Sequence, residues 1–175
     1  MKRFAIVVSF GIASVGLMWA TSASALTITG SVGGAPNGVN RVNFDNLTLG
    51  DYLNSPQTAT GPNGSLTVEL LQDAQIVQGS LSGKYAAPYL SGGNGTGFGT
   101  QPDGPDTTTY LTSGKDGGGD STISLKFDAY LLYFGLLWGS IDDYNTLEFY
   151  SDNTLVDTVT GSMVTASLKT VFPSI

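Results

Sequence analysis

The sequence predicts an all-β protein, an antiparallel β-sandwich of jelly-roll type, and two observations lead to this prediction. The 175 residues include 24 Gly but only two Glu, and good helix formers are scarce throughout. Short runs of alternating apolar and polar residues lie between clusters of Gly, Asn and Asp, without a sustained apolar period near 3.6 residues. A parallel α/β fold is excluded because it needs crossover helices that this sequence lacks.

Strands are expected wherever a short run alternates between apolar and polar residues. In chain order these runs are Leu26–Thr29, Val42–Phe44, Leu66–Leu70, residues 74–78, Ser121–Phe127, Tyr130–Trp138, Leu147–Tyr150 and Thr154–Val159. Residues 74–78 are expected to form a hairpin with Leu66–Leu70. The nearly continuous apolar run Tyr130–Trp138 predicts a central strand covered on both faces. Ser151-Asp152-Asn153 predicts a hairpin turn between the last two strands.

The first 25 residues have the features of a secretory signal peptide. Lys2 and Arg3 precede an uncharged apolar run from Phe4 to Trp19, and Ala23-Ser24-Ala25 matches an A-x-A cleavage motif. A membrane anchor is the alternative, but the run is shorter than the roughly 20 apolar residues that cross a bilayer. We therefore expect cleavage after Ala25, which leaves one β-sandwich domain over residues 26–175.

Composition excludes several kinds of chemistry. The chain has neither Cys nor His, which excludes disulfides, thiol nucleophiles, Ser-His-Asp triads and zinc sites built on imidazole. Removal of the signal peptide changes the formal charge from −7 to −9, because Lys2 and Arg3 are lost and all 14 acidic residues stay. A surface with this negative charge repels the phosphate backbone of nucleic acid, so nucleic acid is not an expected partner.

Aromatic residues are concentrated between Phe127 and Tyr150. Trp and Tyr rings offer flat apolar faces with a polar edge, which suits the faces of sugar rings. Most of these rings are expected to fill the core, and alternation assigns Phe134 and Phe149 to it together with Phe127. The candidate carbohydrate contacts are Trp138, Tyr144, Tyr150 and the loop around Asn94.

A long uncharged, Gly-rich segment from Tyr85 to Pro102 separates the two strand-rich halves, and a loop of this length is often functional. Beyond it, Asp116 and Asp120 bracket three glycines. Calcium takes six to eight oxygen ligands, which flexible Asp/Gly loops can supply. A structural calcium ion at these two carboxylates and a pair of solvated turns are both open interpretations. No other cofactor is expected.

Several motifs resemble the exosortase-dependent surface proteins, or PEP-CTERM proteins, of Gram-negative bacteria. They are Phe44-Asp45-Asn46-Leu47, Tyr89–Gly93, Thr108–Thr112, Leu132–Asp142, Tyr144–Leu147 and Phe149-Tyr150. The resemblance spans roughly Leu26 to Gly161. It implies an exported β-sandwich at the cell surface or in the exopolysaccharide matrix, and it carries no catalytic residue.

The chain departs from that family in one respect. Such proteins end in a Pro-Glu-Pro motif, an apolar helix and a basic tail, whereas this sequence runs to Phe172-Pro173-Ser174-Ile175 without them. The final strand of Phe-Glu-Phe-Asp type is also missing, so residues 162–175 are atypical. We expect either a truncated product or a freely secreted variant.

The function predicted from sequence is that of a secreted, acidic, non-catalytic protein of the cell surface or extracellular matrix. It would act by adhesion or polysaccharide association, with extracellular glycans or surface proteins as partners. One alternative is a glycoside hydrolase that uses Glu69 and Glu148 as its carboxylate pair. A second alternative is a structural surface protein that assembles with itself.

Overall fold

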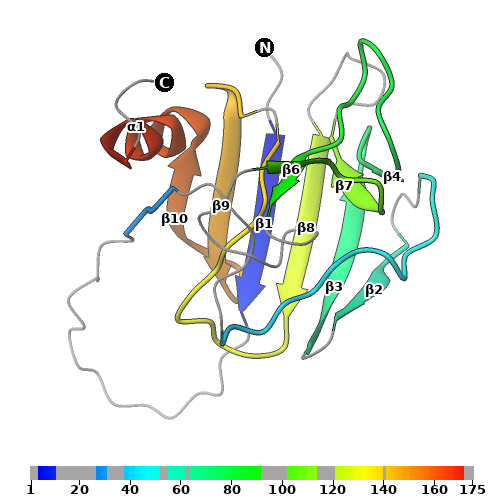
Figure 1. Ribbon diagram of the computed structural model, residues 1–175. Coiled ribbons are helices and arrows are strands. Elements are labelled where there is room, and N and C mark those ends of the chain that lie inside the picture. The colour runs from blue at the N-terminus through cyan, green and yellow to red at the C-terminus, as the bar shows by residue number, and fades with distance from the viewer. Residues whose placement is uncertain are drawn as a thin grey trace, which may run out of the picture.

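The computed structural model describes residues 4–10, 27–30, 38–51, 55–61, 64–91, 102–113, 121–139 and 141–171. Strands dominate these residues, most of them in antiparallel pairs, and one short helix follows the last strand (Figure 1). The all-β prediction is confirmed at this level. Among the described residues, no helix combines the length and the apolar character that crossing a membrane would take.

The elements follow one another in the order that Figure 1 labels. They are β1 (Phe4–Phe10), β2 (Gln57–Gly61), β3 (Gly64–Leu71), β4 (Gln75–Val77), β5 (Tyr89–Ser91), β6 (Pro102–Pro105), β7 (Tyr110–Thr112), β8 (Ser121–Phe127), β9 (Asn145–Ser151), β10 (Thr154–Thr160) and α1 (Gly161–Val171).

A six-stranded sheet in the order β10-β9-β1-β8-β3-β2 organises the molecule. The pairs β10–β9, β8–β3 and β3–β2 are antiparallel, whereas β1 runs parallel to both of its neighbours, β8 and β9. Two short antiparallel pairs, β4–β7 and β5–β6, form separate two-stranded sheets. Because β8 and β9 both run parallel to β1, they also share one direction.

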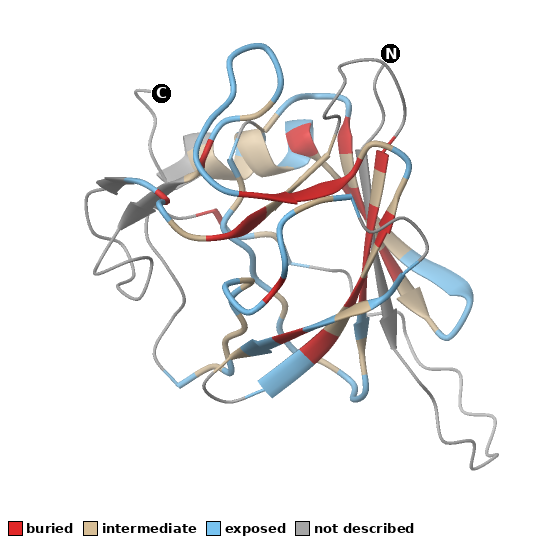
Figure 2. Ribbon diagram, turned by 90° about the vertical axis from the view of Figure 1, so that its right-hand side faces the viewer, coloured by how far each residue is buried: buried red, intermediate tan, exposed pale blue. Residues whose placement is uncertain are grey.

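The main core lies on one face of the six-stranded sheet. Alternate residues of β3, β8 and β9 are buried there, as expected for strands with one covered face. These side chains pack with Ile76 of β4, with Leu47, and with the half-buried Leu111 of β7. A second layer therefore covers this face, and Figure 2 shows buried residues both on the sheet and on the strands that cross it.

The segment before β2 is held in place by polar side chains. Asp45 Oδ1 accepts a hydrogen bond from the backbone N–H of Thr109 at 3.1 Å, which joins residues 38–51 to the segment before β7. Asn46 binds the edge of β2 twice: Oδ1 accepts from the N–H of Thr60 at 2.9 Å, and Nδ2 donates to the carbonyl oxygen of Thr58 at 2.8 Å.

Several predicted strands are confirmed. Leu66–Leu70 lies within β3, and residues 121–127 form β8. The last two predicted strands form the antiparallel hairpin β9–β10. Its turn contains Asp152 at φ 53°, a left-handed conformation that Asp tolerates better than most residues.

The prediction for Tyr130–Trp138 is wrong, because no strand occurs in the described residues 128–139. Residues 128–144 instead connect β8 to β9. Parallel strands need a connection that returns from the end of one strand to the start of the other. We call residues 128–144 the crossover connection.

Other predictions are also wrong. Residues 75–77 form β4 but pair with β7, because the tight turn after Leu71 leads the chain away from β3. The described residues 27–30 and Val42–Phe44 form no strand. The alternation within residues 121–127 predicts that Ser124 faces solvent, yet it is buried.

Helix α1 was not expected from the sequence. It begins where Thr160 Oγ1 accepts a hydrogen bond from the N–H of Met163 at 3.3 Å, which caps the first turn. Val164 packs against the main core, and Gly30 lies so close to Leu168 that a Cβ at position 30 would approach Leu168 Cδ2 to 2.5 Å.

Strand β1 falls within the predicted signal peptide. In the chain that retains this segment, Phe4–Phe10 pairs along its whole length with β8 and β9. Cleavage after Ala25 stays a prediction, and so does the resulting domain boundary.

We predict that Leu70→Ala destabilises the fold far more than Leu155→Ala. Leu70 is 1% exposed in the main core, whereas Leu155 on β10 is 48% exposed. Truncation of a buried Leu costs ~2–5 kcal/mol, while an exposed site changes stability by less than ~1 kcal/mol. Urea unfolding of both variants measures the difference, and equal losses would contradict the assigned core.

We also predict that stability falls as the pH rises from 10 toward 12. Burial raises the pKa of Tyr110 from 10.0 to about 12, with smaller contributions from Tyr85 and Asp106. The folded state thus retains a proton that the unfolded state has lost, so this contribution is complete below pH 10 and lost above 12. Tyr110→Phe should weaken the pH dependence of urea unfolding across this interval.

Candidate binding surface

The predicted carbohydrate contacts do not form one platform. Tyr144 directly precedes β9 and Tyr150 lies near its far end, so an extended strand separates them by roughly 20 Å. Trp138 is half-buried and packs against the main core. Asn94 lies outside the described residues. The geometry therefore separates the residues that the sequence grouped together.

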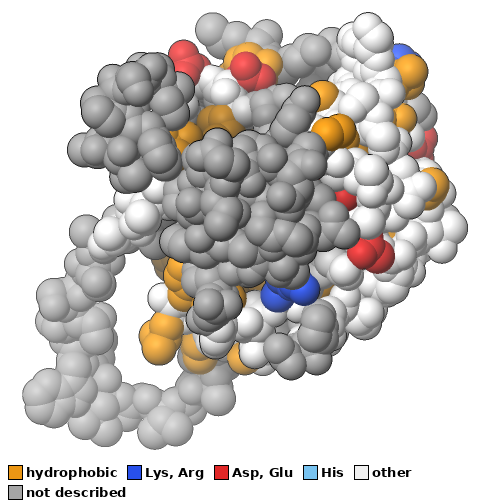
Figure 3. Space-filling model, in the orientation of Figure 1, with side chains coloured by type: hydrophobic (Ala, Val, Ile, Leu, Met, Phe, Trp, Pro, Cys, Tyr) orange, Lys and Arg blue, Asp and Glu red, His pale blue; other side chains and the backbone are white. Residues whose placement is uncertain are grey.

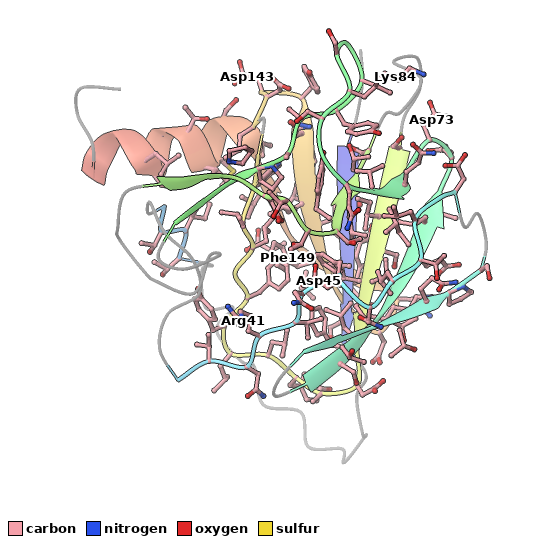
Figure 4. All side chains as sticks on the ribbon, turned by 45° about the vertical axis from the view of Figure 1, so that its right-hand side comes forward. Arg41, Asp45, Asp73, Lys84, Asp143 and Phe149 are labelled. Atoms are coloured by element: carbon pink, nitrogen blue, oxygen red, sulfur yellow. The ribbon has the colours of Figure 1, made fainter. Side chains whose placement is uncertain are left out.

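Tyr144 belongs to a polar cluster at the start of β9. Its hydroxyl donates to Asp142 Oδ2 at 2.7 Å, and this bond is the main reason why the pKa of Tyr144 is raised. The backbone N–H of Asp142 donates to Asn145 Oδ1 at 2.8 Å, and Ser162 Oγ donates to Asp143 Oδ1 at 3.1 Å. Figure 4 shows Asp143 at this end of the sheet, close to α1. The cluster ties the loop to the helix.

The predicted calcium ligands, Asp116 and Asp120, lie outside the described residues. In the parts of the chain that are described, no three Asp, Glu, His or Cys side chains gather as a metal site requires. A structural calcium ion at Asp116 and Asp120 therefore stays a prediction from the sequence.

The two glutamates proposed for hydrolysis lie far apart. The strand registers place Glu69, Ser124 and Glu148 in one row, with Glu69 and Glu148 three strand positions apart, or about 14 Å. Glycosidase pairs are separated by no more than about 10 Å. Glu69 Oε2 pairs with Lys126 Nζ at 2.6 Å, and Glu148 Oε2 accepts from the Tyr150 hydroxyl at 2.9 Å. This arrangement does not favour the hydrolase alternative.

The crossover connection presents apolar side chains to solvent. Tyr130 and Tyr133 are each 55% exposed, and Leu132 is fully exposed. Leu136 and Leu137 add further exposed apolar surface. In Figure 3, hydrophobic side chains gather at the lower left of the face shown, where Figure 1 draws this connection. Contiguous apolar surface on a folded domain commonly marks a binding site.

Two other residues anchor the connection to the core. The Phe134 ring packs edge-on against Phe127 of β8, with centroids 6.0 Å apart, and against Phe149 of β9, 5.8 Å apart. Figure 4 shows Phe149 pointing into the interior. Trp138 forms the second anchor. Phe134 thus holds the connection across two strands while its neighbour Tyr133 faces outward.

Local features orient the two exposed tyrosines. The Tyr133 side chain folds over Gly135, where a Cβ would approach the Tyr133 hydroxyl to 2.5 Å. A side chain at position 135 would push the Tyr133 hydroxyl aside. The pKa of Tyr130 is raised by reduced hydration and then by the negative charge of Asp152 in the β9–β10 turn.

The sequence does not reveal this surface, because a run of apolar residues has the same composition in a buried strand and in an exposed connection. One signal was present. Tyr133 and Gly135 flank Phe134, and glycine inside an apolar run argues against a regular central strand.

Comparison with protein-family models, with curated proteins and with solved structures found no match for this chain. The candidate surface therefore depends on the geometry described above.

We predict that Phe134→Ala releases the crossover connection, whereas Leu132→Ala does not. Loss of the Phe134 ring removes both edge-on contacts and should cost roughly 2–3 kcal/mol, below the full value for a buried Phe. Limited digestion with chymotrypsin should cleave the Phe134→Ala variant faster within residues 128–139. Equal cleavage rates for the two variants would contradict the anchoring role.

Proposed function

We propose that this protein is a secreted, non-catalytic surface or matrix protein that associates with polysaccharide through the exposed residues 130–137 of the crossover connection. The observation that carries the proposal is the exposure of Tyr130 and Tyr133 on a connection anchored by Phe134. Exposed aromatic rings on a fixed backbone suit the apolar faces of sugars, because little conformational freedom is lost on contact.

The net charge of the cleaved chain indicates which kind of polysaccharide it binds. The cleaved chain would carry a formal charge of −9, because Lys2 and Arg3 leave with the signal peptide. Acidic polymers would be repelled at low ionic strength. We therefore propose neutral glycans as the preferred partners, bound by ring stacking and hydrogen bonds.

The proposal includes the finer features expected from sequence. These are removal of residues 1–25, a two-layer β-sandwich of jelly-roll type, and relation to the exosortase-dependent surface proteins. The second layer over β3, β8 and β9 supports the sandwich assignment. Tyr144 and Tyr150 then lie apart from the surface of Tyr130 and Tyr133, and Trp138 acts first as an anchor.

We predict that Tyr133→Ala weakens binding to neutral polysaccharide about tenfold. A ring face covered by sugar loses on the order of 60 Å² of apolar surface from water, worth ~1.5 kcal/mol. Tyr144→Ala is the matched control, because Tyr144 is also an exposed tyrosine but lies at the far end of the crossover connection, where its hydroxyl donates to Asp142.

Affinity electrophoresis through gels that contain a neutral or an acidic polysaccharide measures both variants. The proposal is supported if the neutral polymer retards the original protein and the Tyr144→Ala variant but does not retard the Tyr133→Ala variant. Loss only in Tyr144→Ala would move the site to the polar cluster, and equal retardation of all proteins would overturn the proposed function.

A further inference from the structure

The most consequential feature outside the candidate surface is the central strand position, the place between β8 and β9 that β1 fills. Strand β1 is seven residues long and pairs with both neighbours from Phe4 to Phe10. Those residues belong to the predicted signal peptide. If the proposed export and cleavage occur, the mature protein loses the strand at the middle of its largest sheet.

Loss of β1 would leave a gap about two strand spacings wide, or roughly 10 Å, with an unpaired edge on each side. The buried residues of β8 and β9 define what can fill it. Ile123 and Leu125 on β8 lie in the same rows as Leu147 and Phe149 on β9, and all four are buried. An occupant therefore needs seven extended residues with apolar side chains at alternate positions.

The directions of the strands add a second requirement. Strands β8 and β9 share one direction, β10 and β3 run opposite to them, and β2 runs opposite to β3. An occupant that ran opposite to β1 would make all six strands alternate in direction. Parallel pairs are slightly less stable per residue than antiparallel pairs. The central strand position thus favours an occupant antiparallel to β8 and β9.

One segment of the chain meets the pattern and is released by the same cleavage. Residues 26–32 read Leu-Thr-Ile-Thr-Gly-Ser-Val, seven residues with apolar or small side chains at every second position. Within this segment the described residues 27–30 form no strand. After cleavage it becomes the new N-terminus. Helix α1 is a poorer donor, because it begins directly after β10. Residues 26–32 need only give up the contacts of Ile28 with the main core and of Gly30 with α1.

Connectivity disfavours insertion of this segment into its own sheet. Arg41 lies against Gly61 at the β2–β3 turn, which is the end of the sheet where β8 finishes. Figure 4 shows Arg41 and Asp143 at opposite ends of the molecule. An antiparallel occupant would finish at the other end, about 27 Å from Arg41, and residues 33–40 can span only about 30 Å. A nearly straight linker would be needed.

We propose that the central strand position accepts residues 26–32 from a second copy of the chain, antiparallel to β8 and β9. The exchange rests on the proposed export, because it starts with removal of β1. Each copy then carries one donor segment and one acceptor position on different surfaces. Donation in one direction from copy to copy produces open chains or rings, whereas reciprocal exchange between two copies produces a closed dimer.

The test uses the full chain, exported with its own signal peptide. Mass spectrometry of the recovered protein identifies the N-terminus, and size-exclusion chromatography with light scattering gives the oligomeric state. We expect a chain that starts at Leu26 and forms dimers or larger oligomers. Ile28→Asp should shift the elution to monomer, whereas Thr29→Asp, with the same charge change at the alternate position, should keep the oligomers.

A synthetic peptide with the sequence of residues 26–32 provides a second measurement that needs no variant to fold. Excess peptide should fill the acceptor position and dissociate the oligomers, and the same peptide with Asp in place of Ile28 should not. A cleaved chain that is monomeric, or oligomers that neither peptide nor variant changes, would overturn the exchange alone. Recovery of the uncleaved chain would overturn the proposed export and the exchange together.

Discussion

Strands β8 and β9 point in the same direction with one strand position between them, and this constraint shapes the rest of the molecule. Two parallel strands cannot be joined by a tight turn, so the chain must return from Phe127 to Asn145 across the sheet. The crossover connection is the result. Its apolar residues divide between anchors in the core and side chains in solvent. The same constraint creates the central strand position, which must be filled for the sheet to be continuous.

The sequence predicted the elements in which a local pattern and the tertiary environment agree. In β3, β8 and β9, alternate residues are apolar because one face of each strand is covered. The β9–β10 hairpin also follows from its turn residues. Phe149 was correctly assigned to the interior, since alternation distinguishes inward from outward positions in β9, and Phe134 also packs there although its segment forms no strand.

The incorrect predictions concern features that local pattern does not determine. The apolar residues of the run 130–138 have two different environments. Phe134 packs in the core and anchors the run, whereas Tyr133 is exposed. Strand β4 pairs with β7 because of long-range topology. Strand β1 has the composition of both a signal peptide and a buried strand, and α1 depends on a cap and on tertiary contacts. In each case the deciding contact is remote in sequence.

The motifs that resemble exosortase-dependent proteins have structural roles in this fold. Asp45 bonds to Thr109, so the opening motif and the motif around Tyr110 contact each other directly. Asn46 holds the edge of β2, and Leu47 is buried in the main core. Such residues would be retained wherever this fold is retained, whatever the protein binds. These contacts stabilise the fold, and binding has to be argued from the exposed rings.

The binding surface and the central strand position are mechanically connected. Phe134 packs against Phe127 and Phe149, which belong to the two strands on either side of that position. The spacing between the two rings that support Phe134 is thus set by whichever strand lies between β8 and β9. An empty position would let the two strands move relative to each other, and the crossover connection would lose its fixed support. Stacking on sugars depends on rings that are held in place. The affinity for polysaccharide should therefore increase with the fraction of molecules in which the central strand position is filled.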